Sequence, residues 1–296
     1  MPARDNGAAS HDAGRKPDPG AAPAIRSREL LLRILSSAVI LPPVILLFWV
    51  GGPYFLALVT VVAAVMAWEW ANLVAPRCPA SLRRLAGLIG ALMVLAASLA
   101  FEKPAALVLL VALPLAFALA VRIGSGDWGP QLLPGLFLAL CPAIAIHWIR
   151  EMPELGLETA LWLAFSVVVT DVAAYGAGRT VGGPKLWARV SPSKTWAGLV
   201  GGMAGSACLG AVLGTIVEAA DPALLAGVGA VIAIVAQAGD FAESAVKRAF
   251  GAKDSGRLIP GHGGILDRVD GQIAVLPLAA ALMLLSGKSM LLWSWP

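Results

Sequence analysis

The side chains best suited to chemistry are crowded into one short stretch, between Ser244 and Asp270, which reads SAVKRAFGAKDSGRLIPGHGGILDRVD. With Glu243 just before it, this stretch holds Lys247, Arg248, Lys253, Asp254, Arg257, His262, Asp267, Arg268 and Asp270. Carboxylates grouped among lysines and arginines suit a divalent cation held against phosphate groups, because Mg²⁺ takes a few protein oxygens and fills its shell with phosphate and water. The cationic side chains would bind the remaining phosphate oxygens.

The spacing of these residues predicts two helix ends that face one pocket. Helical offsets of three, four and seven place four residues on one face: Asp240, Glu243, Ser244 and Lys247. Asp267 and Asp270 lie three residues apart at the start of the next apolar stretch, with Arg268 beside them. We therefore expect carboxylates from two helices to meet in one site.

A glycine-rich loop, GHGG at Gly261–Gly264, lies between these two predicted helix ends. Glycine adopts positive φ angles without strain and lets the backbone approach a ligand closely. Pro260 before it favours a rigid turn. The pattern is typical of a loop that binds phosphate, although four residues alone are weak support.

A second group of polar residues lies between Thr170 and Gly198. Asp171 falls inside an apolar stretch, where an ionised group is costly and by default functional. The sequence SPSKT places hydroxyl groups on both sides of Lys194, directly before another apolar stretch. Ser191, Lys194 and Thr195 therefore predict either an anion-binding site or a helix cap, and the sequence favours neither.

The elements that must position these residues are apolar segments long enough to cross a membrane. Hydrophobic residues make up 58% of the chain, charged residues 14%, and the mean hydropathy is +0.80, values unlike those of soluble domains. Nine spans are predicted, near residues 30–50, 53–73, 85–101, 104–122, 131–149, 157–178, 197–217, 222–239 and 271–287. The sequence thus predicts an all-α, polytopic integral protein of the cell (inner) membrane.

The chain divides into three predicted parts. Residues 1–28 are expected to be a disordered cytoplasmic tail, residues 29–150 to hold five spans, and residues 151–296 to form a catalytic region with four spans and two cytosolic loops. With a cytoplasmic N-terminus, only three of the 22 lysines and arginines fall on the opposite side: Lys103, Arg150 and Lys288. The charged residues are therefore expected at cytosolic helix ends, within reach of water-soluble substrates.

The segment 197–217 carries small residues at four-residue spacing, namely Gly201, Gly205, Gly210 and Gly214. Such glycines let helices approach closely. We expect this segment to pack against other helices, either of the same chain or of a second subunit.

The stretch from Ser244 to Asp270 resembles the signature of the phosphatidate cytidylyltransferases, or CDP-diglyceride synthases. The matched positions are Ser244, Lys247, Arg248, Lys253, Asp254, Gly256, Pro260, His262, Gly263, Gly264, Asp267, Arg268 and Asp270. TDVAAYGAGR, SPSKTWAG and QAGDFAES, which begin at residues 170, 191 and 237, resemble the same family, whereas residues 1–150 match it only in hydropathy. Ala197 stands where the family commonly has a glutamate, so a role for that acid is not carried over.

The resemblance implies transfer of CMP from CTP to phosphatidate, giving CDP-diacylglycerol and pyrophosphate, by a homodimer in the lipid bilayer. It implies Mg²⁺ bound by Asp240 and Asp267, with K⁺ as a candidate monovalent cation nearby. Phosphate oxygens would be neutralised by Lys194, Lys247, Arg248, Lys253 and Arg268. Asp171 would bind a second cation or orient Lys194, and His262 would bind pyrophosphate or position the loop. The other expected substrate-binding residues are Ser191, Thr195, Ser244, Asp254, Gly263, Gly264 and Asp270.

Other readings of these residues stay open. The charged stretch would be an ordinary basic connection if its acids and bases only neutralised one another. A secondary transporter would account for the many spans and for Asp171, but it leaves the dense cytosolic motif unexplained. CDP-archaeol synthases and CTP-dependent polyprenol kinases use the same nucleotide with another lipid. No nucleic-acid partner is expected.

Overall fold

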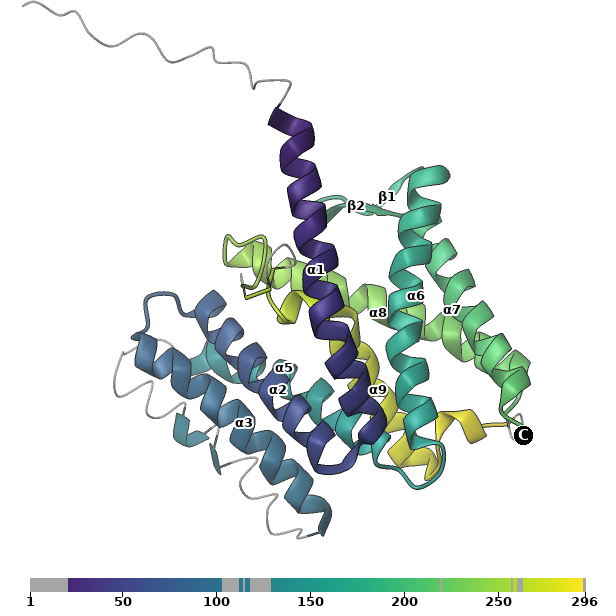
Figure 1. Cartoon of the computed structure of the whole chain (residues 1–296), viewed down its shortest axis with the longest axis horizontal. Helices are drawn as coiled ribbons and strands as arrows, with labels where there is room; N and C mark the ends of the chain where they lie inside the picture. The colour runs from purple at the N-terminus through teal and green to yellow at the C-terminus, as the bar shows by residue number, and fades with distance from the viewer. Residues whose placement is uncertain are drawn as a thin grey trace, which may run out of the picture.

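A computed structural model of the chain describes residues 21–102, 112–113, 115–117, 129–218, 220–256, 258–259 and 263–294. Its helices are α1 (Ala21–Val50), α2 (Gly52–Val74), α3 (Ala80–Glu102), α5 (Gly129–Arg150), α6 (Gly156–Thr180), α7 (Trp196–Ile216), α8 (Pro222–Ala249) and α9 (Asp270–Ser286) (Figure 1). Strands β1 (Lys185–Trp187) and β2 (Ser191–Thr195) pair antiparallel, and η2 (Leu266–Arg268) and η3 (Met290–Leu292) are 3₁₀ turns. The predicted all-α class is confirmed for these residues, with one small hairpin added.

The predicted spans coincide with these helices, except for 104–122, which lies largely outside the described residues. Five helices, α2, α3, α6, α7 and α8, are long and apolar enough to cross a membrane, and shorter apolar helices lie within α1, α5 and α9. These helices indicate an integral membrane protein.

Two helix boundaries differ from the prediction. Helix α1 begins at Ala21, so residues 21–28, which were expected to belong to the tail, are helical, whereas residues 1–20 lie outside the described part. Alanine-rich sequence favours a helix, and Pro23 falls in its first turn, where proline is tolerated. Helix α8 continues to Ala249 instead of ending near residue 239, because charged residues lower the hydropathy without breaking a helix.

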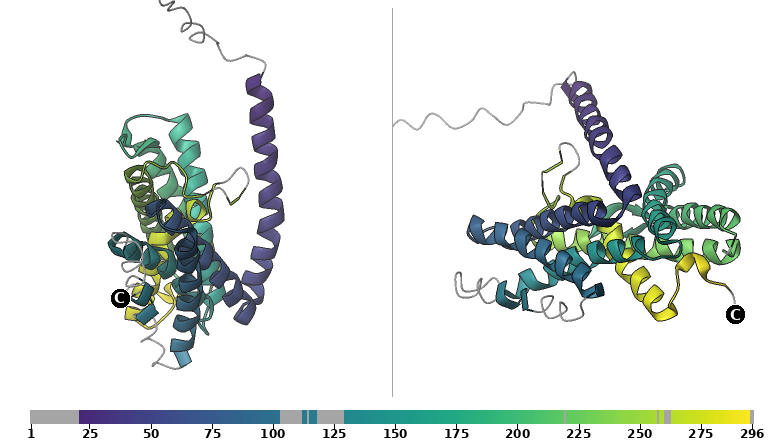
Figure 2. Two further views of the ribbon diagram at one scale, coloured as in Figure 1. Left: turned by 90° about the vertical axis from the view of Figure 1, so that its left-hand side faces the viewer. Right: turned by 60° about the horizontal axis from the view of Figure 1, so that its bottom comes forward.

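Helices α2, α3 and α5 form one layer, at the lower left of Figure 1. Its core includes the buried side chains of Phe55, Met66, Leu136 and Leu140. The end of α5 holds the turn between α1 and α2, because Arg150 Nε donates a hydrogen bond to Phe48 O at 2.9 Å. Helix α1 stands away from the other helices over its first half (Figure 2).

Helices α6, α7 and α8 pack together through small residues of α7. A Cβ atom at Gly205 would lie 2.7 Å from the Ala173 Cβ of α6, and one at Gly214 would lie 2.5 Å from the Pro222 Cα of α8. Because no side chain fits at either contact, the helices need glycine there. Close packing by these glycines is confirmed, and it joins helices of the same chain.

Helix α8 is the longest of these three, about 42 Å at 1.5 Å per residue. Asp221 caps it, because Asp221 Oδ1 accepts hydrogen bonds from the Ala223 and Leu224 amides at 2.9 and 3.2 Å. The first part of α8 packs on α7 and α9, and its last turns carry the polar residues that the sequence singled out. Helix α8 thus extends from the apolar interior to the group of polar residues near its end.

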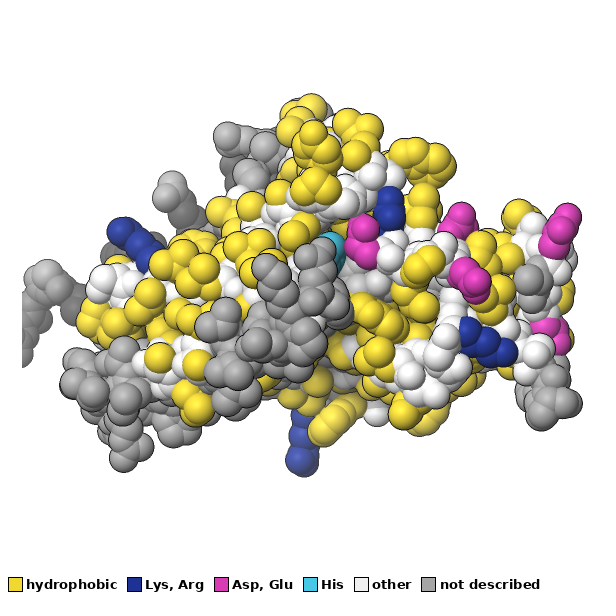
Figure 3. Space-filling model, turned by 90° about the horizontal axis from the view of Figure 1, so that it is seen from below, with side chains coloured by type: hydrophobic (Ala, Val, Ile, Leu, Met, Phe, Trp, Pro, Cys, Tyr) yellow, Lys and Arg dark blue, Asp and Glu magenta, His cyan; other side chains and the backbone are white. Residues whose placement is uncertain are grey.

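The described surface is mainly apolar. Large hydrophobic side chains are exposed on several helices, for example Leu46, Val172, Val200 and Leu284. Seen from below, apolar side chains cover most of the described part of this face, and charged side chains are scattered (Figure 3). A surface of this kind is stable against lipid and not against water.

Candidate active site

The last turns of α8 place their polar side chains on one face, as the spacing predicted. Ser244 Oγ donates a hydrogen bond to Asp240 Oδ1 at 3.3 Å, and Lys247 Nζ forms an ion pair with Glu243 Oε2. Both contacts join residues four positions apart, which are neighbours on a helix. Helix α8 therefore brings carboxylate, hydroxyl and ammonium groups to one site.

Lys247 also joins α8 to the loop before α9. Its Nζ donates to Asp267 Oδ1 at 2.7 Å, and the side chains of Lys247 and Asp267 are only 10% and 5% exposed. Asp267 Oδ2 accepts hydrogen bonds from the Ser255 and Gly264 amides, each at 2.9 Å. One buried carboxylate thus fixes Lys247 of α8 together with Ser255 and Gly264, which lie towards the two ends of the signature loop, the connection between α8 and η2.

The pKa of Asp267 follows from these contacts. Burial raises the pKa of this carboxyl, but the hydrogen bond from Lys247, the amide of Gly264, the charge of Lys247 and the amide of Ser255 outweigh it. The net result is a pKa below the ordinary value, so Asp267 is ionised at neutral pH.

Lys194 reaches the same part of α8 from the hairpin. It lies in β2, where its Nζ forms an ion pair with Asp240 Oδ2 and stands 4.9 Å from the centre of the Phe241 ring. The Trp187 ring of β1 lies 6.3 Å from the same phenyl ring. The hairpin is therefore anchored on α8 by one aromatic side chain, and Lys194 is directed at the carboxylate of Asp240.

Thr195 is a helix cap, which decides one of the open alternatives. Thr195 Oγ1 accepts a hydrogen bond from the Gly198 amide at 3.1 Å, at the start of α7. Ser191 lies at the other end of β2, opposite Trp187. The predicted anion-binding role therefore rests on Lys194.

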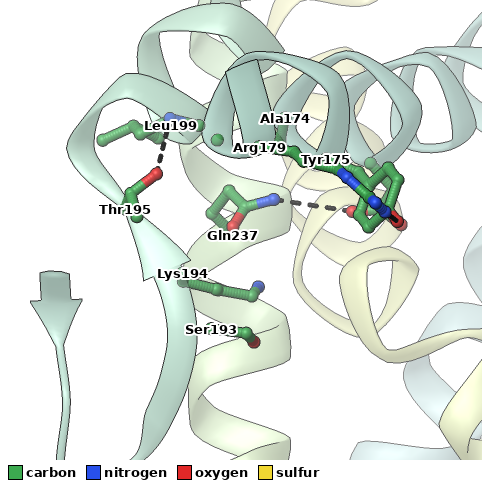
Figure 4. A pocket seen from close by; sticks show the side chains of 11 residues that line it. Ala174, Tyr175, Arg179, Ser193, Lys194, Thr195, Leu199 and Gln237 are labelled. Atoms are coloured by element: carbon green, nitrogen blue, oxygen red, sulfur yellow. Dashed lines mark hydrogen bonds between the residues drawn. The ribbon is translucent and has the colours of Figure 1, made fainter. Parts of the chain in front are cut away.

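A cavity of about 450 Å³ opens beside Lys194 (Figure 4). Its lining comprises Asp171, Ala174, Tyr175, Gly178, Arg179, Ser193, Lys194, Thr195, Gly198, Leu199 and Gln237. Gln237 Nε2 donates to Asp171 Oδ1 at 3.5 Å, and Arg179 Nη1 donates to Tyr175 Oη at 2.7 Å. Two cations, Lys194 and Arg179, thus line a cavity that is polar enough for a phosphate group.

Several lining residues were not predicted, and three of them make side-chain hydrogen bonds at the cavity: Tyr175, Arg179 and Gln237. Tyr175 and Arg179 follow Asp171 at four-residue spacing, so all three lie on one face of α6. That spacing was a signal in the sequence, and it was available within the motif that begins at Thr170. Gln237 also carried a signal, because it is the first residue of QAGDFAES, although its neighbours in α8 are mostly apolar.

The carboxylates that converge most closely are Asp240, Glu243 and Asp270, each of which offers an oxygen within 4.8 Å of the others. Asp240 belongs to the predicted metal pair. Its predicted partner Asp267 differs from these three acids because it accepts hydrogen bonds from two backbone amides of other segments, those of Ser255 and Gly264, as well as from Lys247. Asp270 begins α9, where its Oδ1 accepts from the Gly271 amide at 2.7 Å. Three acidic oxygens so close together suit a divalent cation.

The remaining predicted residues lie around this centre. Arg248 Nη1 donates to Ala252 O at 2.8 Å, beyond the end of α8. Lys253, Asp254 and Arg268 are exposed, and His262 lies outside the described residues. Gly263 has a φ of +83°, and a Cβ atom there would lie 2.8 Å from Asp267 Oδ2. Gly263 and Gly264 therefore lie close to the Asp267 carboxylate.

One buried acid was missed entirely. Glu69 of α2 is only 1% exposed, and its carboxylate accepts hydrogen bonds from Leu266 N at 2.9 Å, Ile265 N at 3.1 Å and Ser255 Oγ at 3.4 Å. The sequence placed it within an ordinary apolar span. Its role appears only when the signature loop is seen folded against α2.

Comparisons with known proteins identify the family of the chain. The model of the "Cytidylyltransferase family" matches residues 31–286. A Brucella suis biovar 1 (strain 1330) protein named phosphatidate cytidylyltransferase is 41% identical over 260 residues, which cover 87% of this chain and 93% of that protein. A Pseudomonas aeruginosa protein of the same name is 34% identical over 268 residues, which cover 86% and 97% of the two chains.

These matches correct one expectation. Residues 1–150 were expected to match the family in hydropathy alone, but the family model begins at residue 31 and both alignments cover most of the N-terminal half. Helices α1, α2, α3 and α5 are therefore part of the family's shared structure. The chain belongs to the cytidylyltransferase family.

Proposed function

We propose that this protein is a phosphatidate cytidylyltransferase, which transfers CMP from CTP to phosphatidate. The names of its relatives support this, and the observation that carries it is a cavity with two cations beside three converging carboxylates. A phosphate oxygen of phosphatidate attacks the α-phosphorus of CTP. The bond from that phosphorus to the bridging oxygen of the β-phosphate breaks, and pyrophosphate leaves.

The main obstacle to this reaction is electrostatic, because an anion must approach a nucleotide with about four negative charges. Lys194 and Arg179 supply positive charge at the cavity, and Asp240 holds the Lys194 ammonium in place. The second pKa of a phosphate monoester is about 6, so the lipid phosphate is already ionised at neutral pH. Alignment and charge neutralisation are therefore sufficient, and no strong general base is required.

We propose that Mg²⁺ binds at Asp240, Glu243 and Asp270, whose oxygens already converge. Bound there, it would neutralise phosphate charge as the bond to the leaving group breaks. Asp267 would then not bind the metal ion. It would position Lys247 and the backbone at Gly264, both of which donate hydrogen bonds to it. A monovalent cation such as K⁺ near these carboxylates remains part of the proposal.

Two variants separate this proposal from the pair expected from the sequence. Asp270→Asn should raise the Mg²⁺ concentration needed for half-maximal activity about tenfold or more, because one ligand oxygen loses its charge. Asp267→Asn should lower the maximal rate with a smaller change in that concentration. The opposite pattern would assign the metal to Asp240 and Asp267.

We further propose that the chain crosses the cell (inner) membrane nine times, with a cytoplasmic N-terminus, and that it acts as a homodimer. The long apolar helices and the basic loops support this topology. Cytosolic CTP would then reach the last turns of α8, and phosphatidate would reach the same site from the bilayer. Accessibility of single cysteines placed before α1 and after α9 to an impermeant reagent tests the orientation.

The proposed reaction is tested with purified protein in detergent, labelled CTP and phosphatidate, in Mg²⁺ or in EDTA. We expect CDP-diacylglycerol to form only with Mg²⁺ and to fall strongly in Lys194→Met. Lys185→Met, in the neighbouring strand, is the matched control and should keep its activity. If product forms with a polyprenol or an archaeal-type lipid but not with phosphatidate, the family assignment stands and the proposed lipid substrate is wrong.

A further inference from the structure

The signature loop is held by a carboxylate from the other half of the chain. Glu69 Oε1 accepts a hydrogen bond from the Ile265 amide at 3.1 Å, and Oε2 accepts from the Leu266 amide at 2.9 Å and from Ser255 Oγ at 3.4 Å. These partners lie between 186 and 197 residues away in sequence. Glu69 of α2 therefore anchors the loop, although it lies outside all of the sequence motifs.

The charge of Glu69 has an unusual environment. The residue is 1% exposed, and among the described residues no lysine, arginine or histidine lies within 4.0 Å of its carboxylate. The negative charge is stabilised by two backbone amides and one hydroxyl. A buried carboxylate is costly unless its hydrogen bonds are made, so this arrangement favours one loop conformation over others.

Two signature glycines leave room for this carboxylate. A Cβ atom at Gly256 would lie 2.6 Å from Glu69 Oε1, and one at Gly264 would lie 2.6 Å from Glu69 Oε2. Neither residue has a positive φ angle that would by itself demand glycine. An added methyl group would meet the Glu69 carboxylate at both positions, and at Gly264 it would also meet Ser255 Oγ, so glycine leaves room for the bonds between these groups.

Glu69 and Asp267 bind the same short loop from two sides. Asp267 accepts from the Gly264 amide, and Glu69 accepts from the next two amides, those of Ile265 and Leu266. Ser255 contacts both acids, through its amide to Asp267 and through its hydroxyl to Glu69. Displacement of Glu69 would therefore release the loop that aims Asp267 at Lys247.

We propose that Glu69 is a positioning residue: it fixes Ser255 and the backbone of Ile265 and Leu266 and, through them, the Asp267–Lys247 pair. The prediction for kcat rests on the proposed function, whereas the prediction for proteolysis does not. Glu69 itself contacts no reacting atom. It acts because a carboxylate can accept from both amides, which an amide side chain cannot.

The test compares Glu69→Gln with Asn72→Ala, a change in the same helix at a side chain that donates to Trp68 O of that helix. The glutamine side chain of the first variant would direct an NH₂ group at one of the loop amides. We expect trypsin to cleave about tenfold faster after the exposed Lys253 in Glu69→Gln, at a temperature well below unfolding. We also expect kcat to fall at least tenfold, with KM for CTP and phosphatidate changed less than threefold.

Unchanged cleavage in Glu69→Gln overturns the proposal, whether or not kcat falls, because the loop would then be ordered without Glu69. Phe55→Ala removes a buried side chain near the opposite end of α2 from Glu69. It shows what a general loss of stability does, and it should leave cleavage after Lys253 unchanged. Absence of activity in the unmodified protein would defeat the proposed function and leave the cleavage test intact.

A second variant covers the case in which Glu69→Gln does not fold. Gly256→Ala keeps the carboxylate but places a methyl group against it, so it should also accelerate cleavage after Lys253. In a Glu69→Ala background the same methyl group meets no carboxylate, and Gly256→Ala should have little further effect. Fully additive effects of the two changes would show that they act separately and would overturn the proposal.

Discussion

Lys247 and Lys194 both lie against carboxylates of α8, yet their surroundings differ. Lys247 is buried between Glu243 and Asp267, with 10% of its side chain exposed. Within the described part of the chain, Lys194 pairs with one acid, Asp240, and lines an open cavity. The comparison teaches that the same residue type has two surroundings here: Lys247 neutralises two buried carboxylates, whereas Lys194 pairs with Asp240 at the wall of a cavity, where our proposal assigns it to a substrate phosphate.

The largest effect should come from Lys247→Met. This change leaves Glu243 and Asp267 buried without their shared cation, and loss of one member of a buried ion pair costs about 3–5 kcal/mol. We expect a large fall in the melting temperature and loss of activity. Lys288→Met, at an exposed position, is the control, and a melting temperature of Lys247→Met equal to that of the unmodified protein would break the comparison.

Lys194→Met should separate activity from stability. Its ion pair with Asp240 is partly exposed and contributes less to folding than a buried one. We expect kcat/KM to fall about 10²–10³-fold, because a cation aimed at phosphate charge is lost, while the melting temperature changes little. A variant that unfolds as readily as Lys247→Met would show that the two lysines have the same role.

Arg179→Met should sharpen the assignment of the cavity. Arg179 donates to Tyr175 at the cavity wall, and loss of one charge-assisted contact to phosphate corresponds to about tenfold in KM. The substrate whose KM rises, CTP or phosphatidate, is the one that the cavity binds. Arg189→Met, in the hairpin turn, is the matched control, and equal effects of the two changes would remove Arg179 from the site.

The smallest effect concerns pH. The pKa of Asp267 is lower in the folded protein than in the unfolded chain, so its contribution to stability is complete above about pH 4 and is lost as the pH falls through the folded value. We expect the melting temperature to drop more steeply in this acidic range in the unmodified protein than in Asp267→Asn. Parallel curves would show that Lys247 does not depend on this carboxylate.

The sequence predicted local geometry well, because helical spacing determines which side chains share a face. Asp240, Ser244 and Lys247 were expected on one face of a helix, and their contacts confirm it. The end of α8 was placed too early, since hydropathy reports burial in lipid and not helix formation. The cap at Thr195 was one of two readings that local sequence alone left equal.

Contacts between distant segments were harder to predict. The bond from Lys247 to Asp267 depends on how the loop folds back over α8, and the approach of Lys194 to Asp240 depends on a hairpin with three and five residues in its strands. Glu69 lay in an apolar segment with no motif of its own. Such pairs are determined by tertiary packing, and the periodicity and spacing of residues in one segment do not report which distant segment packs against it.

The hydrogen bonds that Glu69 accepts from the signature loop also have a consequence for truncated forms of the gene. A truncated gene that encoded only residues 129–296 would keep the four motifs that begin at residues 170, 191, 237 and 244. Its product would lack the acid that the Ile265 and Leu266 amides require. We expect residues 1–128, supplied as a separate polypeptide, to restore activity only if they bring Glu69 back to these amides.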